Sequence, residues 1–265
     1  LAGVMTPEEA MRAVMARGQA MFEQPVGAML AVRSGLDELQ ALPPGIDVAA
    51  LNAPALTVVA GPHADIDAFA QALEARDIGV TRLKVSHAFH SAAMDGALPK
   101  VQAALSQADL KAPQLPVYSC VTGAPLTAQE ACDPAYWARQ VRAPVAFSRA
   151  IQAEQSQASP IFIEVGPGQA LSALVRQHRA AQASPLVIPL LSSPQTAAPP
   201  ARHAMQALGL LWSQGVHIAL PVPPRTPRIP LPTYPFRRDV HWFKRRTSTP
   251  QMPACRPQPT TAMNR

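Results

Sequence analysis

The chain has 265 residues, of which 48% are hydrophobic and 15% charged, so it predicts a globular protein with one large core or two smaller ones. Its net charge is +6, but nine Arg and Lys against one acid from Pro221 onward place the excess in a tail, which excludes a basic nucleic-acid-binding face elsewhere. No apolar run is long enough for a membrane span and no signal peptide is evident, so we expect a cytoplasmic protein. Cys120, Cys132 and Cys255 match no zinc or disulfide pattern and are expected to be reduced and structural.

The first predicted element is a helix that starts after Thr6. Thr6 is a typical N-cap, Pro7 suits the first helical position, and Glu9 stands where a capping box needs an acid. Apolar residues then recur at helical spacing as far as Met21. We expect this helix to end before Pro25.

The next sixty residues predict a small α/β module. Strands are expected at 28–32, 46–51, 56–60 and 80–85, with a short helix at 36–42 and an amphipathic helix at 65–76. The order βαββαβ is that of a ferredoxin-like module, whose helices cover one face of an antiparallel sheet.

Beyond residue 90, strands and helices alternate in a second pattern. Helices are expected at 98–105, 136–140, from 145, at 170–178 and at 204–214, and strands at 115–119, 161–165 and 186–190. This alternation predicts an open, mainly parallel sheet, so the small module is expected to be an insertion in a larger α/β domain.

The C-terminal part is rich in proline. Sixteen of the thirty prolines lie from Pro185 onward, and a chain of this kind cannot form a regular core. We expect residues 221–243 to form an extended strap on the domain and residues 244–265 to be a disordered linker.

Two histidines follow the last strand of the small module, in the stretch 85–91 (VSHAFHS). A histidine there can act as a general base, although a lone histidine is more often a hydrogen-bonded core residue. The HAFHS stretch resembles the acyltransferase domain of type I modular polyketide synthases, relatives of malonyl-CoA:acyl-carrier-protein transacylases and of fatty acid synthases. This form of the motif is usual in malonyl-selective members.

The resemblance implies a fold and a set of boundaries. The fold would be α/β, with an incomplete α/β-hydrolase-like large subdomain and an inserted ferredoxin-like small subdomain. The large subdomain would comprise residues 1–25 and 87–220, the small subdomain 26–86, a post-acyltransferase linker 221–243 and a disordered tail 244–265.

The resemblance also assigns roles to three residues of the motif and to Gln140. His90 takes the place of the catalytic histidine, which accepts a serine proton and returns it to a thiol. His87 and Phe89 hold the motif's first and third positions, which correlate with the substituent on the extender unit. A bulky Phe89 would crowd a methyl group, so malonyl is expected to be preferred. The backbone carbonyl of Gln140 is expected to orient the catalytic histidine.

Other motifs carry the resemblance along the chain. Arg17 resembles the arginine that pairs with the free carboxylate of malonyl, although an exposed helix arginine is the commoner case. Asn52 falls where the family has an asparagine facing the pocket. Glu164 and the glycines after it (EVGPG) resemble a family turn; a dinucleotide loop is excluded because Leu171 replaces the third glycine.

The serine nucleophile that the resemblance implies is missing from this sequence. The first four residues (LAGV) resemble the segment that follows the family's Gly-His-Ser-x-Gly elbow, and no such elbow occurs in the sequence. Ser91 is a poor substitute, because it directly follows the base and lacks flanking glycines. We therefore expect the isolated chain to be inactive. A noncatalytic scaffold or complementing fragment of a split synthase, and an α/β hydrolase with another nucleophile, stay as alternatives.

The resemblance implies the partners as well. They would be malonyl-CoA, an acyl carrier protein, and the adjacent ketosynthase and other synthase domains of a secondary-metabolite pathway. Residues 230–236 (PLPTYPF), followed by His241 and Trp242, resemble the post-acyltransferase linker. No covalently bound cofactor or metal is expected, because phosphopantetheine is carried by CoA and by the carrier protein. Neither nucleic acid nor a membrane is an expected partner.

Overall fold

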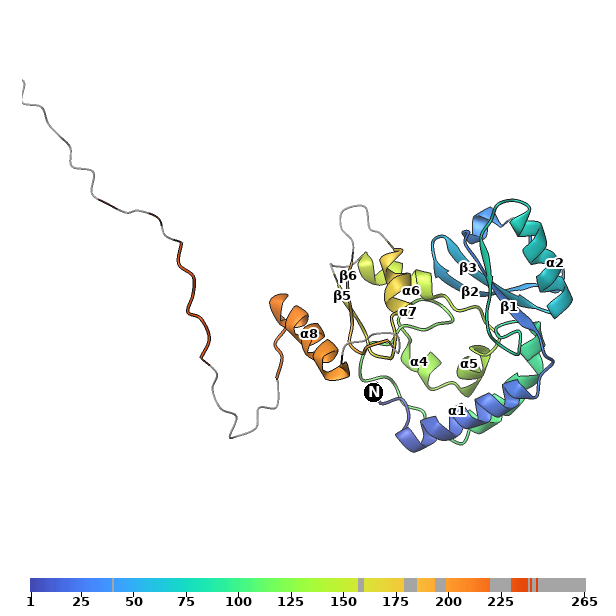
Figure 1. Ribbon diagram of the computed structural model, residues 1–265. Coiled ribbons are helices and arrows are strands. Elements are labelled where there is room, and N and C mark those ends of the chain that lie inside the picture. The colour runs from blue at the N-terminus through green and yellow to red at the C-terminus, as the bar shows by residue number, and fades with distance from the viewer. Residues whose placement is uncertain are drawn as a thin grey trace, which may run out of the picture. The chain divides into compact units, whose positions relative to one another are not determined.

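The computed structural model describes residues 1–39, 41–156, 160–178, 185–193, 199–219, 230–237, 239 and 242. The chain forms two units, residues 1–218 and 219–265, and each is described by itself (Figure 1). Most of the predicted strap and the whole predicted tail lie outside the described residues.

A four-stranded antiparallel sheet forms the small module (Figure 1). Its strands are β1 (Ala28–Val32), β2 (Asp47–Ala53), β3 (Leu56–Gly61) and β4 (Val80–Arg82), in the order β2-β3-β1-β4. Helix α2 (His63–Glu74) packs on one face of the sheet. This strand order is the one that a ferredoxin-like module requires, so the predicted fold of the insertion is confirmed.

The central strand β1 is buried on both faces, which explains its continuous apolar sequence. Successive side chains of a strand point to opposite faces. Leu30 therefore packs beneath α2 with Ile66, while Met29 joins Ala50 on the other face, where Phe89 of the histidine motif packs. The sheet thus supports α2 on one side and the motif on the other.

Two predicted elements of secondary structure are wrong. The helix expected at 36–42 is only the 3₁₀ turn η1 (Leu36–Glu38), whose N-cap Gly35 supplies no side-chain hydrogen bond to start a longer helix. The strand expected at 115–119 is reduced to one bridge between Tyr118 and Pro125, because Pro116 has no N–H to donate.

Helix α1 (Pro7–Phe22) begins as predicted. Thr6 and Glu9 form a reciprocal capping box, and the Glu9 carboxylate also accepts the Asp109 N–H at 2.9 Å. These hydrogen bonds, with the one from Asp109 contributing most, lower the pKa of Glu9 to about 2. Helix α1 packs against the 3₁₀ helix η2 (Ala92–Ala97) and α3 (Leu98–Leu105), and α5 (Pro134–Arg139) packs on α3.

A second, parallel pair of strands supports the predicted larger α/β domain. Strands β5 (Ile161–Glu164) and β6 (Leu186–Pro189) pair in parallel, and α7 (Ala170–Arg176) lies between them in sequence. Helices α6 (Phe147–Gln155) and α8 (Pro200–Ser213) complete this part. The short helix α4 (Ala128–Ala131) was not predicted, although the capping box of Thr127 and Glu130 signals its start.

Other expectations about the chain have mixed outcomes. No helix in the described parts of the chain is long and apolar enough to cross a membrane. Cys120 and Cys132 are free thiols at exposed positions, so their expected structural role stays a prediction; Cys255 lies outside the described residues. In the second unit, the rings of Tyr234 and Phe236 pack edge to face, with centroids 5.1 Å apart. The strap itself stays a prediction.

Candidate functional site

Backbone hydrogen bonds connect the histidine motif (residues 85–91) to the residues just before β1. The N–H of Gly27 donates to the carbonyl of Ser86 at 3.1 Å, and Val26 and His87 form an isolated antiparallel bridge. A Cβ atom at Gly27 would lie 2.7 Å from the Cβ of Ala88, so only glycine permits this close approach. The motif therefore has a fixed position relative to the small sheet.

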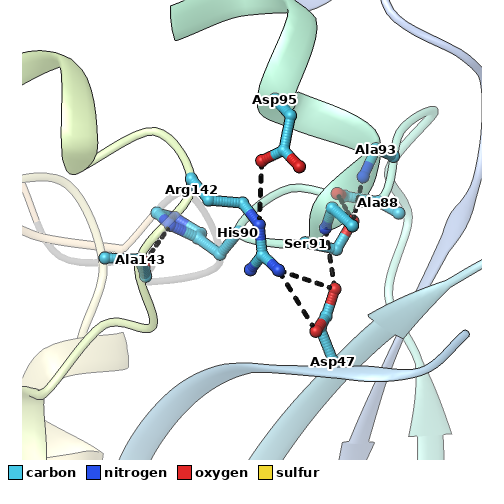
Figure 2. A network of polar contacts seen from close by, with 9 residues as sticks. Asp47, Ala88, His90, Ser91, Ala93, Asp95, Arg142 and Ala143 are labelled. Carbon is cyan, nitrogen blue, oxygen red and sulfur yellow. Dashed lines mark hydrogen bonds and ion pairs between the residues drawn. The ribbon is translucent and has the colours of Figure 1, made fainter. Parts of the chain in front are cut away.

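The backbone of His90 adopts the left-handed conformation, with φ 59°. A non-glycine residue there costs on the order of 1–3 kcal/mol, and such residues cluster at functional sites. The next residue secures the turn, because the Ser91 hydroxyl donates to the carbonyl of Ala88 at 2.6 Å and accepts the N–H of Ala93 at 3.3 Å (Figure 2). The hydrogen bonds of Ser91 thus stabilise the strained backbone of His90, and the side chain of His90 is half-buried.

The ring of His90 is oriented by a backbone carbonyl. Its Nδ1 lies 2.8 Å from the carbonyl oxygen of Ala143 (Figure 2). A carbonyl only accepts hydrogen bonds, so Nδ1 carries the proton in the neutral ring and Nε2 keeps its lone pair. His90 therefore has the tautomer of a general base acting through Nε2.

The carbonyl that makes this contact is not the expected one. The resemblance predicted the carbonyl of Gln140, whereas the hydrogen bond goes to Ala143, three residues later. Gln140 is the C-cap of α5, and Ala143 precedes Pro144, which favours an extended backbone and turns this carbonyl out of the helical path. The Gln140 backbone contributes more weakly, as the smallest of the effects on the pKa of His90.

The surroundings of His90 favour its neutral form. Burial is the largest cause and lowers the pKa of His90, and the positive charge of Arg17 lowers it further. The hydrogen bonds to the backbone of Ala143 and Gln140 raise the pKa, but burial prevails. The ring is thus ready to accept a proton at neutral pH.

A cavity of about 250 Å³ lies between α1 and the motif, and it is lined by Arg17, Gly18, Met21, Phe22, Ser86, His87 and Phe89. The guanidinium Nε of Arg17 is buried and has no hydrogen-bond partner among the described residues. Burial also lowers the pKa of Arg17. A buried N–H donor without an acceptor is costly, so this cavity suits a ligand that carries an acceptor such as a carboxylate.

His87 forms a wall of this cavity and is not a second base. Its Nε2 donates to the carbonyl of Phe22 at 3.1 Å, and its Nδ1 accepts from the hydroxyl of Ser86 at 2.8 Å. The ring is 3% exposed and its centroid lies 5.8 Å from those of both Phe22 and Phe89. His87 therefore ties the end of α1 to the motif and supports the ring of Phe89.

Two other expected residues lie elsewhere. Asn52 is half-buried in β2 and does not line the cavity, so its contact with a ligand stays a prediction. Glu164 accepts the N–H groups of Leu171 and Ser172 at 3.1 and 2.8 Å, which satisfies the start of α7. The EVGPG turn is therefore a helix-capping structure in this fold.

The buried histidines predict how stability depends on pH. The pKa of His178 is lowered like that of His90, with burial as the largest cause; His178 donates to the Leu174 carbonyl at 2.9 Å and accepts the Ser148 hydroxyl at 2.8 Å. Unfolded histidines keep a pKa of about 6.5 and take up protons first as the pH falls. The free energy of unfolding is therefore at its full value above about pH 6.5 and decreases below it.

Urea denaturation at two pH values measures this effect. The midpoint is expected to be lower at about pH 5.5 than at about pH 7.5, and a variant with His178→Gln is expected to show a smaller difference. The glutamates with lowered pKa values titrate below this window. Equal midpoints at both pH values would contradict the prediction.

Comparisons with known proteins agree with this geometry. A family model described as "Acyl transferase domain" matches residues 1–210. The chain is 38% identical over 249 residues to a phenolphthiocerol/phthiocerol polyketide synthase of Mycobacterium tuberculosis, and this match covers 92% of the chain but 17% of that protein. The chain thus spans about a sixth of the length of this relative.

Solved structures show the same fold. The acyl transferase domain of SpnD, in complex with 2-(pent-4-yn-1-yl)malonyl, aligns with a TM-score of 0.77 and 30% identity over 81% of this chain and 52% of that one. The acyltransferase domain from the second module of the salinomycin polyketide synthase aligns with a TM-score of 0.75 and 35% identity, over 82% and 51%. With the family match over most of its length, the chain belongs to the acyl transferase domain family and has its α/β fold.

Proposed function

We propose that this chain is part of the acyltransferase domain of a modular polyketide synthase, which transfers malonyl from malonyl-CoA to the phosphopantetheine thiol of an acyl carrier protein. The observation that carries the proposal is that Arg17, whose buried Nε has no hydrogen-bond partner among the described residues, lines a cavity and lies close enough to His90 for its charge to lower the pKa of that histidine. A carboxylate-binding cation next to a base suits an acyl group that ends in a free carboxylate.

The proposed reaction proceeds through a covalent intermediate. A serine hydroxyl attacks the thioester carbonyl of malonyl-CoA and gives its proton to Nε2 of His90, and the CoA thiolate leaves with that proton. The carrier-protein thiol then gives a proton to His90 and attacks the seryl ester, and the serine oxygen takes the proton back. Arg17 holds the distal carboxylate throughout, so the reacting carbonyl stays aligned.

Within this proposal the nucleophile is contributed by residues outside this chain, since no Gly-His-Ser-x-Gly occurs in the sequence. The experiment mixes the isolated chain with malonyl-CoA and holo carrier protein and follows the mass of the carrier protein. No transfer is expected from the chain alone, and transfer is expected when the same chain is joined to a preceding segment that carries the elbow. Robust transfer by the pure chain, or none by the joined polypeptide, would refute the proposal; the latter favours a noncatalytic scaffold.

Phe89 is proposed to select malonyl. Its ring lines the cavity and packs with His87 on one side and with the cluster of the small sheet on the other, so it has little room to move. A methyl group on the substrate would have to displace this ring. One methyl in a pocket changes specificity by about 1–3 kcal/mol, which is about 10- to 200-fold.

The change Phe89→Ser in the joined polypeptide tests this selection. The ratio of kcat/KM for malonyl-CoA to that for methylmalonyl-CoA is expected to fall by at least about tenfold, because the smaller side chain leaves room for the methyl group. The matched control is Phe69→Leu, which changes a buried ring of α2 that packs on the opposite face of the sheet, and is expected to leave the ratio unchanged. An unchanged ratio in the Phe89 variant would rule the selection out.

Further parts of the proposal concern the surroundings of the chain. The partners would be an acyl carrier protein, the adjacent ketosynthase and other synthase domains, in the cytoplasm. Phosphopantetheine would enter only as part of CoA and of the carrier protein. The division into subdomains at 1–25, 26–86 and 87–220, with a linker at 221–243, is proposed on the same resemblance, and the sheet of residues 28–82 supports the inserted module.

A further inference from the structure

A polar cluster joins the small sheet to the loops on either side of His90 (Figure 2). The guanidinium of Arg142 lies between two carboxylates, with Nη2 3.3 Å from Asp47 Oδ2 and Nε 3.0 Å from Asp95 Oδ1. Asp47 Oδ2 also accepts the N–H of Ala92 at 2.7 Å. Three segments far apart in sequence therefore meet here: the first residue of β2, the helix η2, and the loop after α5.

The loop after α5 carries the carbonyl that orients His90, and β2 holds this loop at two points. Arg142 directly precedes Ala143 and pairs with Asp47. On the other side, the N–H of Leu51 donates to the carbonyl of Val145 at 2.8 Å, and the N–H of Val145 donates to the carbonyl of Ala49 at 2.9 Å. The carbonyl of Ala143 thus lies between two attachments to the same strand.

The histidine is held from its other side by the same acid. Ala92 lies two residues after His90, and its N–H is bound by Asp47. One carboxylate therefore fixes both partners of the Nδ1–H···O=C hydrogen bond, one through a side chain and the other through a backbone group. Asp47 therefore contacts the residue before Ala143 and a residue just after His90, without touching the hydrogen bond between them.

The position of the pair favours a role beyond surface stability. The side chains of Asp47 and Arg142 are 33% and 30% exposed, whereas those of the ion pair between Asp67 and Arg82, on the same module, are 56% and 42% exposed. Less exposed charges are less screened and constrain geometry more. The pair of Asp67 and Arg82 therefore serves as a matched control, because the described residues show no contact between this pair and His90 or Ala143.

We propose that Asp47 and Arg142 are positioning residues that hold the Ala143 carbonyl against His90 and so fix the Nδ1–H tautomer of the ring. By this arrangement the small sheet takes part in setting the base as well as in enclosing the cavity. The tautomer is a property of this chain alone, and only its consequence for the transfer rate rests on the proposed function.

The experiment measures the side-chain ¹⁵N shifts of His90 in the 265-residue chain, at a pH where the ring is neutral. In the wild type the protonated nitrogen is expected to be Nδ1. Asp47→Ala and Arg142→Met, each checked for an unchanged amide spectrum elsewhere, are expected to shift the ring toward the mixture of a free imidazole, in which Nε2–H predominates. Asp67→Ala is expected to leave the tautomer unchanged. An unchanged tautomer in both site variants, or an equal change in the control, would overturn the proposal.

A kinetic measurement separates this proposal from the proposed function. In the joined polypeptide that carries the nucleophile, Asp47→Ala and Arg142→Met are expected to lower kcat about tenfold, equivalent to about 1.4 kcal/mol, with KM within about twofold. A shifted tautomer with an unchanged kcat would support the positioning role and contradict the role of His90 as the base. An increase confined to KM, with the tautomer unmoved, would contradict the positioning role.

Discussion

Replacing His90 by Asn is expected to lower the rate of malonyl transfer about a thousandfold, within the range of about 10²–10⁴ that general base catalysis contributes. Asn tolerates the left-handed backbone that His90 adopts, so the loop is expected to keep its conformation. The amide side chain cannot accept and return a proton. The measurement is the single-turnover rate of seryl-ester formation from malonyl-CoA in the polypeptide that includes the nucleophile.

A control variant shows whether the loss of rate is specific to His90 or follows from replacing any histidine by asparagine. His63 is exposed at the start of α2, and His63→Asn is expected to leave the rate within about twofold, as for a surface change. The two variants are expected to differ because the Ala143 carbonyl binds Nδ1 of His90 and leaves its Nε2 available to accept a proton. A His90 variant that retains the wild-type rate would show that another group takes the proton.

Replacing Arg17 by Met is expected to change binding and stability in opposite directions. Loss of a charge-assisted pair of hydrogen bonds to the substrate carboxylate costs about 1.5–3 kcal/mol, so kcat/KM for malonyl-CoA is expected to fall about 10- to 150-fold. Acetyl-CoA has no distal carboxylate, so its kcat/KM is expected to stay the same or rise. Kinetics with the two CoA esters measure the reversal of preference.

The same substitution is expected to raise the free energy of unfolding by about 1 kcal/mol, because a half-buried guanidinium with an unpaired Nε is replaced by an apolar chain. Urea denaturation measures this gain. Arg12→Met, at an exposed position on the same helix, is the matched control and is expected to alter neither quantity. A loss of stability together with unchanged malonyl kinetics would mean that Arg17 has a structural role.

Local sequence patterns correctly predicted the helices and strands that are signalled by a few consecutive residues. Thr6 and Glu9 determine the start of α1, and the apolar run 28–32 determines β1, because each signal is contained in a few consecutive residues. The strand expected at 115–119 failed because Pro116 has no N–H to donate to a ladder, which periodicity alone does not register. This proline is visible in the sequence and could have corrected that prediction.

The candidate site likewise has residues that the sequence could predict and features that only the structure shows. The motif with His90 and the helix with Arg17 could be found because each residue stands in a recognisable short pattern. The cavity between them, the engagement of both nitrogens of His87 and the unpaired Nε of Arg17 depend on how α1 meets the motif loop. No pattern of consecutive residues contains that information.

By itself, the sequence determined that the small sheet is an insertion and that a histidine and an arginine are candidates for chemistry, because side-chain period and short motifs are local properties. Only the tertiary structure decided which carbonyl orients His90. It also decided that Asp47, more than forty residues before His90 in the sequence, pairs with Arg142, the residue before that carbonyl. The physical reason is that backbone carbonyls are identical in every residue, so their role depends on where the folded chain places them and not on which residue carries them.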